Sequence, residues 1–121
     1  MPSPEQVVQA QLEAYNARDL DALLATYAAD ACSYLYPATL VAQGHAAIGA
    51  RMAQRFAEPD LHARLLRRVV LGEVVIDDEI VTRNFPEGRG TQAMTMIYRV
   101  SDGRIRDASA IMGEMRLDAS V

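Results

Sequence analysis

Residues 65–82 are LLRRVVLGEVVIDDEIVT, two aliphatic and β-branched runs separated by a Gly-Glu pair. Such runs are typical of β-strands, and a two-residue break containing glycine predicts a hairpin turn. Counting outward from that turn places Arg68 opposite Asp77 and Arg67 opposite Asp78. Because opposite charges at facing positions stabilise an antiparallel pair, these residues favour this register. The stretch therefore predicts the first hairpin of an antiparallel sheet.

Two more strands are expected after this hairpin. The segment NFPEGRG at residues 84–90 predicts a long turn, and residues 91–100 form the next extended run. Asp102 and Gly103 then give a strong hairpin signal, which leads to a last strand at residues 105–112. The second half of the chain is therefore expected to hold four meandering antiparallel strands.

The N-terminal part has helical periodicity instead. Ser3 and Gln6 form a capping box around Pro4, and together these residues predict the start of a helix. Asp19 can cap a second helix, whose apolar face is expected to run through residues 20–27.

A short strand is expected between these two helices and a third one. Residues 32–36, CSYLY, are rich in aromatic side chains and predict the strand, whereas residues 37–43 are expected to be a loop. The third helix starts near Gly44 and ends at Pro59, because proline disfavours a helical residue before it. Three helices packed on one curved, mainly antiparallel sheet make an α+β architecture, whose layers enclose a cone-shaped pocket.

Composition excludes several kinds of chemistry. The chain has 121 residues, which predicts a single domain over residues 1–121. All 12 basic residues are arginine, so no lysine is available for Schiff-base catalysis or for a P-loop. With one cysteine, Cys32, and two histidines, a zinc site built from thiolates is excluded, and we expect neither a metal nor another cofactor.

Charge and hydropathy bear on partners and location. The formal net charge of −4 argues against nucleic acid as a partner. No apolar run approaches the about 20 residues of a membrane span, so no membrane contact is expected. No basic segment followed by an apolar run opens the sequence as in a secretion signal, and we therefore expect a cytoplasmic protein.

Several short motifs share one family resemblance. The motif YNARDLD at residues 15–21 is followed by YAADA at residues 27–31, by VIDDE at residues 75–79 and by IYRVSDGRI at residues 97–105. In this order and spacing the chain resembles the nuclear transport factor 2-like superfamily. The resemblance implies a cone-shaped α+β barrel, often a homodimer, of the kind found in ketosteroid isomerases, SnoaL-like polyketide cyclases, scytalone dehydratase and limonene epoxide hydrolase. It does not imply one reaction.

The resemblance does not extend to the catalytic side chains of ketosteroid isomerases. Their reaction needs an aspartate base, with a tyrosine and a neutral aspartic acid that donate hydrogen bonds to the developing oxyanion. When the chain is aligned through residues 16–21, the tyrosine position falls on Gln11 and the base position on Leu35 or Tyr36. The second acid position falls on Met96. A steroid isomerase mechanism of the known kind is therefore not expected.

The same alignment gives a candidate site for a hydrophobic small molecule. Tyr36 is the candidate hydrogen-bond donor, and His62 is the candidate group for proton transfer because histidine titrates near neutral pH. The candidate ligand-binding residues have flexible apolar or aromatic side chains, and they are Tyr15, Tyr34, Met94, Met96, Tyr98 and Met112. The alternative is that these side chains fill the core and bind no ligand.

The acidic run at residues 77–79 has a structural explanation. Strand alternation sends Asp77 and Glu79 to one face and Asp78 to the other. Because arginines stand opposite, the acids need no catalytic role. We therefore expect ion pairs on an exposed or dimer-facing side of the sheet.

Three functions remain open on the sequence. The first is a SnoaL-like enzyme of isomerase, cyclase or lyase type with a hydrophobic pocket, the second a non-catalytic module that binds a small ligand, and the third a dimerisation domain. A homodimer is expected through the open face of the sheet, where Val69, Leu71, Ile76 and Ile80 supply apolar side chains.

Overall fold

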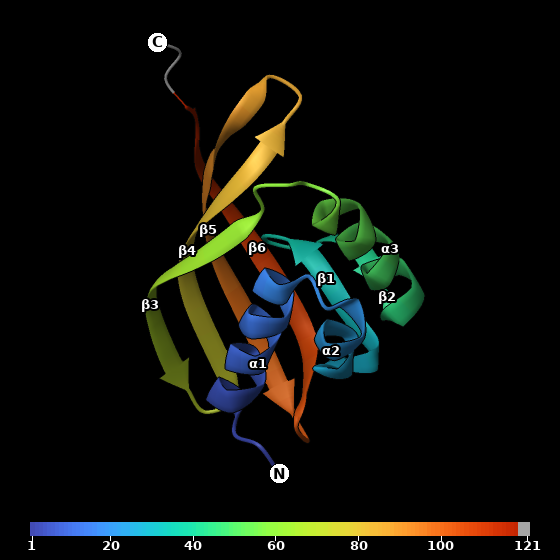
Figure 1. Ribbon diagram of the computed structural model, residues 1–121. Helices are drawn as coiled ribbons and strands as arrows, with labels where there is room; N and C mark the ends of the chain where they lie inside the picture. Colours follow the sequence, from blue (N-terminus) through green and yellow to red (C-terminus); the bar gives the residue numbers. More distant parts are fainter. Residues whose placement is uncertain (119–121) are drawn as a thin grey trace.

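Within residues 1–118, which the computed structural model describes, three helices pack on one face of a six-stranded sheet (Figure 1). The elements are α1 (Pro4–Ala17), α2 (Leu20–Ala25), β1 (Tyr27–Leu35), β2 (Thr39–Gln43), α3 (Gly44–Phe56), β3 (His62–Leu71), β4 (Val74–Phe85), β5 (Gly88–Ser101) and β6 (Arg104–Leu117). The strand order is β2-β1-β6-β5-β4-β3. Neighbouring strands are antiparallel except β1 and β6, which run parallel.

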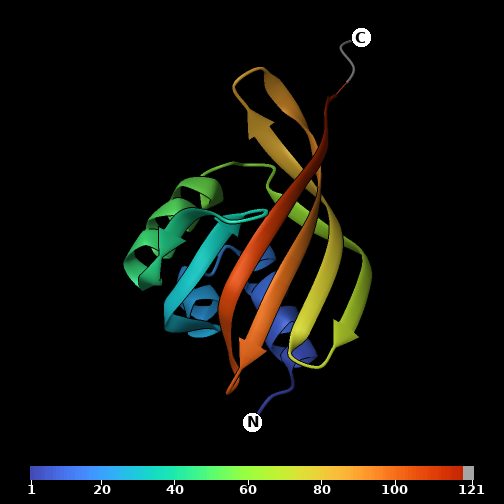
Figure 2. The same cartoon turned by 180° about the vertical axis from the view of Figure 1, so that it is seen from behind.

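The sheet is curved but open. β2 and β3 are its two edges in the described part of the chain, so the α+β architecture is confirmed and closure into a cone-shaped barrel is not. Figure 2 shows the opposite face of the sheet, which no helix of residues 1–118 covers. Val69 and Leu71 are exposed there. The homodimer that would cover this face stays a prediction.

The two N-terminal helices begin where their capping residues predict. The Ser3 hydroxyl accepts a hydrogen bond from the Gln6 backbone at 3.2 Å, and the Gln6 side chain accepts one from the Ser3 backbone at 2.8 Å. Asp19 caps α2 by accepting from the backbone of Ala22 at 3.0 Å. None of the helices in residues 1–118 is both long and apolar enough to cross a membrane.

Several boundaries differ from the sequence expectation. β1 begins before residue 32, and β6 continues to Leu117, beyond residue 112. The second helix ends at Ala25, so Tyr27 opens β1 instead of completing a helical face. β2 lies within the segment expected to be a loop, because it pairs with β1 along the sheet edge. The long turn expected at residues 84–90 is shorter, since β4 continues to Phe85 and β5 begins at Gly88. In each case tertiary strand pairing overrides a weak local signal.

The expected register of the β3–β4 hairpin is confirmed. Arg68 pairs with Asp77 and Arg67 with Asp78. A bulge between Leu65 and Arg67 then shifts the register by one residue. Such a bulge bends the strand and increases its twist, which helps β3 to curve over the helical layer.

The motif at residues 15–21 that carries the family resemblance ties the helices to the strands. The Asn16 side chain donates to the carbonyl of Ala63 at 2.9 Å and accepts from its amide at 2.8 Å. Arg18, at the end of α1, donates to the carbonyls of Glu58 and Pro59 at 2.8 and 2.9 Å. Asn16 thereby fixes α1 to the start of β3, beside the space enclosed by the two layers.

The Asn16→Ala variant is expected to lower the free energy of unfolding by about 2 kcal/mol, because it leaves both backbone groups of a buried residue without their partner. Urea unfolding followed by circular dichroism measures this change. Gln54→Ala, an exposed substitution on α3, is the control and should change stability by less than about 0.5 kcal/mol. Equal stability of the two variants would contradict the role given to Asn16.

Candidate functional site

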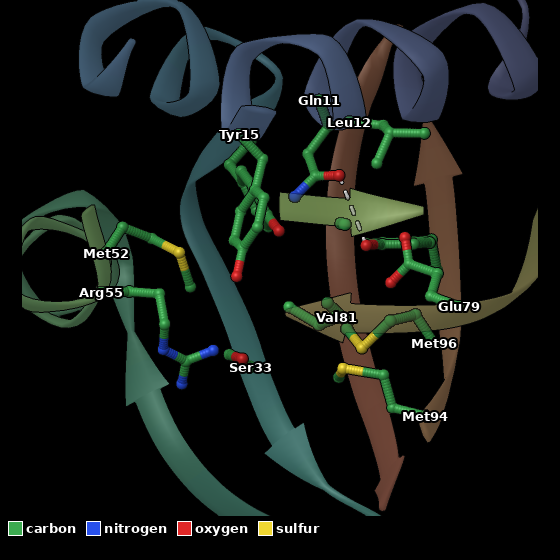
Figure 3. Close-up of a pocket in the computed structure, with 14 residues that line it drawn as sticks. Gln11, Leu12, Tyr15, Ser33, Met52, Arg55, Glu79, Val81, Met94 and Met96 are labelled. Atoms are coloured by element: carbon green, nitrogen blue, oxygen red, sulfur yellow. Dashed lines mark hydrogen bonds between the residues drawn. The ribbon is translucent and has the colours of Figure 1, made fainter. Parts of the chain in front are cut away.

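A cavity of about 80 Å³ lies between the helices and the concave face of the sheet (Figure 3). Liquid water would fill this volume with about three molecules, and pockets for drug-sized ligands are roughly 300–1,000 Å³. The lining residues come from both layers and are Gln11, Leu12, Tyr15, Tyr27, Ser33, Met52, Arg55, Ala63, Glu79, Val81, Met94, Met96, Tyr98 and Ala108. The lining thus combines apolar side chains with one acid, one arginine, an amide and four hydroxyl groups.

Glu79 supplies the acid in this cavity. It lies on β4 between Asp77 and Val81, and its side chain points into the space between the layers, toward the side of α1 (Figure 3). Glu79 is only 6% exposed. Burial raises its pKa to about 7, the negative charge of Asp77 adds to the increase, and the positive charge of Arg68 opposes it. Near neutral pH this carboxyl group can therefore both accept and donate a proton.

Asp77 and Arg68 form a buried ion pair next to Glu79. Arg68 donates to the two carboxylate oxygens of Asp77 at 2.7 and 2.9 Å, and it also donates to the Gln9 side chain at 2.9 Å. Asp77 is 1% exposed. The expectation that Asp77 and Glu79 lie on an exposed or dimer-facing side is therefore wrong, because this face of β4 packs against the helices.

Three buried tyrosines place hydroxyl groups around the same space. Tyr98 donates to the side-chain oxygen of Gln11 at 3.4 Å. Burial raises the pKa of Tyr15, Tyr27 and Tyr98, and the negative charge of Glu79 contributes to each increase. These groups therefore remain protonated at neutral pH. Tyr15 and Tyr27 can each donate a hydrogen bond to a ligand oxygen, whereas the hydroxyl proton of Tyr98 goes to Gln11.

Four of the residues expected to bind a ligand line this cavity, namely Tyr15, Met94, Met96 and Tyr98. Tyr34 instead lines a hollow with Asp107 and Ser109 on the other face of the sheet. Met112 is 48% exposed and lies outside the cavity.

The two residues expected to be catalytic are not among the lining residues. Tyr36 follows β1 and is 54% exposed, and His62 is an exposed residue at the start of β3. The structure therefore does not bring Tyr36 and His62 together with Tyr15, Met94, Met96 and Tyr98.

Glu79 was not among the candidate site residues, although the sequence holds a signal for it. Alternation puts Asp77 and Glu79 on one face of the strand, and only Arg68 of the opposing arginines shares that face. One arginine cannot form a bidentate pair with both acids, so the second acid is left with a raised pKa. Gln11, Tyr27, Ser33 and Arg55 gave no comparable signal, because strands and helices distant in sequence bring them to the cavity.

No group of three or more histidine, cysteine, aspartate or glutamate side chains gathers as a metal site would in residues 1–118. The cavity's own side chains supply one titrating carboxyl group, several hydroxyl groups and one permanently charged guanidinium group.

The fold of this chain is also found in other proteins. Several solved structures share it, with the nuclear transport factor 2-like or ketosteroid isomerase-like fold among their descriptions. The chain itself belongs to the SnoaL-like domain family, whose profile matches residues 8–108. The resemblance drawn from the sequence motifs is thus confirmed. No curated protein sequence matches the chain.

Three solved structures illustrate the range of relatives. An uncharacterised cystatin-fold protein from Novosphingobium aromaticivorans is 25% identical with a TM-score of 0.85, covering 92% of this chain and 99% of that one. A candidate polyketide cyclase from Sinorhizobium meliloti is 28% identical with a TM-score of 0.72, covering 91% and 94%. Rv0760c from Mycobacterium tuberculosis, in complex with estradiol-17β-hemisuccinate, is 18% identical with a TM-score of 0.81, covering 96% and 100%.

The raised pKa of Glu79 predicts a pH-dependent stability. Folding raises this pKa from the model-compound value of 4.5 to about 7, so the folded chain keeps a proton that the unfolded chain loses in this window. Raising the pH from about 4.5 to 7 therefore destabilises the wild-type chain relative to Glu79→Gln, by about 3 kcal/mol in total.

Urea unfolding of both proteins at a series of pH values measures this difference. Glu87→Gln, which removes an exposed acid, should follow the wild-type curve at every pH. Parallel curves for wild type and Glu79→Gln would show that the Glu79 pKa is not raised by folding.

Proposed function

We propose that the cavity binds a small carbonyl compound and that Glu79 acts as the general base of a proton-transfer enzyme of isomerase, cyclase or lyase type. The observation that carries the proposal is a buried carboxyl group with a pKa of about 7 that faces a cavity lined by tyrosine hydroxyl groups. A base is most effective when its pKa lies near the working pH, and glutamate reaches that range when it is buried.

The chemistry begins with the ionised form of Glu79. Its carboxylate takes a proton from a carbon next to the substrate carbonyl, and the electron pair of the broken C–H bond moves to the carbonyl oxygen as an enolate. Tyr27 is the hydrogen-bond donor for this oxygen, and Tyr98 becomes a second donor when its hydroxyl proton turns from Gln11 to the enolate oxygen. In a substrate with a C=C bond next to the enolate, protonated Glu79 then returns the proton to the far carbon of the dienolate and the double bond shifts. Alternatively the enolate expels a leaving group from the adjacent carbon, and that group takes the proton from Glu79. Preorganised donors of this kind stabilise the charge that develops in the transition state.

The polar and apolar side chains that line the cavity indicate what kind of substrate fits it. Glu79, Arg55 and the hydroxyl groups stand among three methionines, so the cavity offers polar anchors within a flexible apolar wall. A small polar molecule fits this lining better than the hydrophobic small molecule expected from the alignment. A larger substrate would require Met52, Met94 or Met96 to change rotamer.

Relatives of known structure support a role in small-molecule chemistry, but they do not identify the reaction or the substrate. Solved neighbours include a candidate polyketide cyclase and an epoxide hydrolase from Mycobacterium tuberculosis, and others hold trimethylamine or estradiol-17β-hemisuccinate. A non-catalytic binding module would have the same cavity but would need no base. The buried Glu79 favours the enzyme over that module and over a domain that only dimerises.

Deuterium exchange into a panel of small enolisable ketones and oxo acids, followed by proton NMR, tests the proposal without a known substrate. Wild type should accelerate exchange of at least one compound, with a rate that rises with pH through about 7. Glu79→Gln should lower this rate by roughly 100-fold or more. Glu87→Gln is the matched control and should exchange like wild type. Exchange by Glu79→Gln at the wild-type rate would refute the role of Glu79.

A further inference from the structure

Arg55 is the one charged group on the opposite side of the cavity from Glu79 (Figure 3). It belongs to the last turn of α3, and its side chain is 26% exposed. In Figure 3 its guanidinium group extends toward Ser33 and the hydroxyl end of Tyr15. The positive charge of Arg55 opposes the burial that raises the pKa of Tyr15, so the two groups lie close together.

Within the described residues, the guanidinium group of Arg55 makes one long ion pair. This pair joins Nε to Glu58 at 3.8 Å. Both carboxylate oxygens of Glu58 already accept stronger hydrogen bonds from Arg83, at 2.8 and 2.7 Å, and one of them also accepts from the Asn84 backbone at 2.9 Å. Glu58 is therefore satisfied by Arg83. A hydrogen bond between Arg55 and the Tyr15 hydroxyl also opposes the rise in the Tyr15 pKa, and the guanidinium group, which has five N–H donors, keeps others for another group.

The surroundings of Arg55 carry a positive charge in an otherwise acidic chain. A polar hollow beside the cavity is lined by Arg51, Arg55 and Arg83, with Glu58 as its single acid. The whole chain has a net charge of −4. A local excess of arginines at this site attracts anions and leads them toward the cavity.

We infer that Arg55, together with the hydroxyl groups of Tyr15 and Ser33, binds the carboxylate of the substrate, which is a small oxo acid. A guanidinium group presents two parallel N–H donors that match the two oxygens of a carboxylate, and a neutral amide cannot replace that acceptor pair. Tyrosine and serine hydroxyl groups can each donate one further hydrogen bond.

The two charges at the ends of the cavity also fix the orientation of such a molecule. Ionised Glu79 repels a carboxylate, whereas Arg55 attracts it. The acid group therefore settles at Arg55, and the carbonyl end is directed toward Glu79 and the tyrosines. The cavity volume of about 80 Å³ suits a short oxo acid and excludes the skeleton of a steroid unless the walls move. This inference rests on the proposed function only for the identity of the reacting end.

Binding of pyruvate and levulinate, each compared with its primary amide, tests the inference on the full chain. Isothermal titration calorimetry measures affinity, and proton–nitrogen NMR spectra identify the residues whose signals move. Wild type should bind at least one acid about tenfold or more tightly than the matching amide, with shifts at Ser33 and Arg55. Comparable affinities of acid and amide, or saturable binding of neither acid, would overturn the inference.

Arg55→Gln should remove the preference for the acid, while Arg64→Gln, which deletes an exposed arginine of β3, should keep it. Arg55→Lys retains the charge and should recover only part of the preference, because it lacks the planar pair of donors. An unchanged preference in Arg55→Gln contradicts the assignment. The comparison of acid with amide in wild type does not depend on any variant folding.

Glu79→Gln separates this inference from the proposed function. The variant should keep or increase the preference for the acid, since Arg55 is retained and the negative charge that repels the carboxylate is removed. If it exchanges deuterium like wild type while the acid preference depends on Arg55, the base is misassigned and the carboxylate site stands. If exchange depends on Glu79 but Arg55→Gln binds acids normally, Glu79 is the base and the carboxylate site at Arg55 is misassigned.

Discussion

Two carboxyl groups are buried on one face of β4 with a single guanidinium group between them and the helical layer. Arg68 pairs bidentately with Asp77, and Glu79 is left with no ion pair of its own in residues 1–118. Removing a carboxylate from water is unfavourable unless it is paired, so the unpaired acid keeps its proton to a higher pH. Burial without an ion pair of its own, together with the negative charge of Asp77, raises the pKa of Glu79, and the chemistry proposed for the cavity depends on this.

The rest of the fold arranges groups around this strand. Alternation along β4 points Asp77, Glu79, Val81 and Arg83 in turn toward the helices, and the last of these holds Glu58 near the end of the cavity where Arg55 lies. Asn16 attaches α1 to β3 and so fixes the helix that carries Gln11 and Tyr15. A site that is negative at one end and positive at the other results from residues far apart in sequence. The fold supplies the frame, and the chemistry comes from these side chains.

Local rules predicted much of this frame. The capping box at Ser3 and the charge pairing of Arg68 with Asp77 were sufficient to place α1 and the β3–β4 hairpin. β2 was missed because its strand character comes from pairing with β1 and not from its own pattern. Of the candidate site residues, Tyr15, Met94, Met96 and Tyr98 line the cavity, while Tyr36 and His62 lie outside it, and their roles stay predictions. Glu79 was expected, with the rest of the acidic run, on an exposed or dimer-facing side of the sheet, because burial, which decides its pKa, is a property of the packed layers.

The pKa of Glu79 is the quantity on which the account depends, and NMR can measure it directly. Titration of the side-chain carboxyl carbon in wild type, assigned with Glu79→Gln, should give a midpoint near pH 7. A Glu79 midpoint near the ordinary glutamate value of 4.5 would contradict this, since a carboxyl group fully ionised well below neutral pH would be a weak base in this cavity.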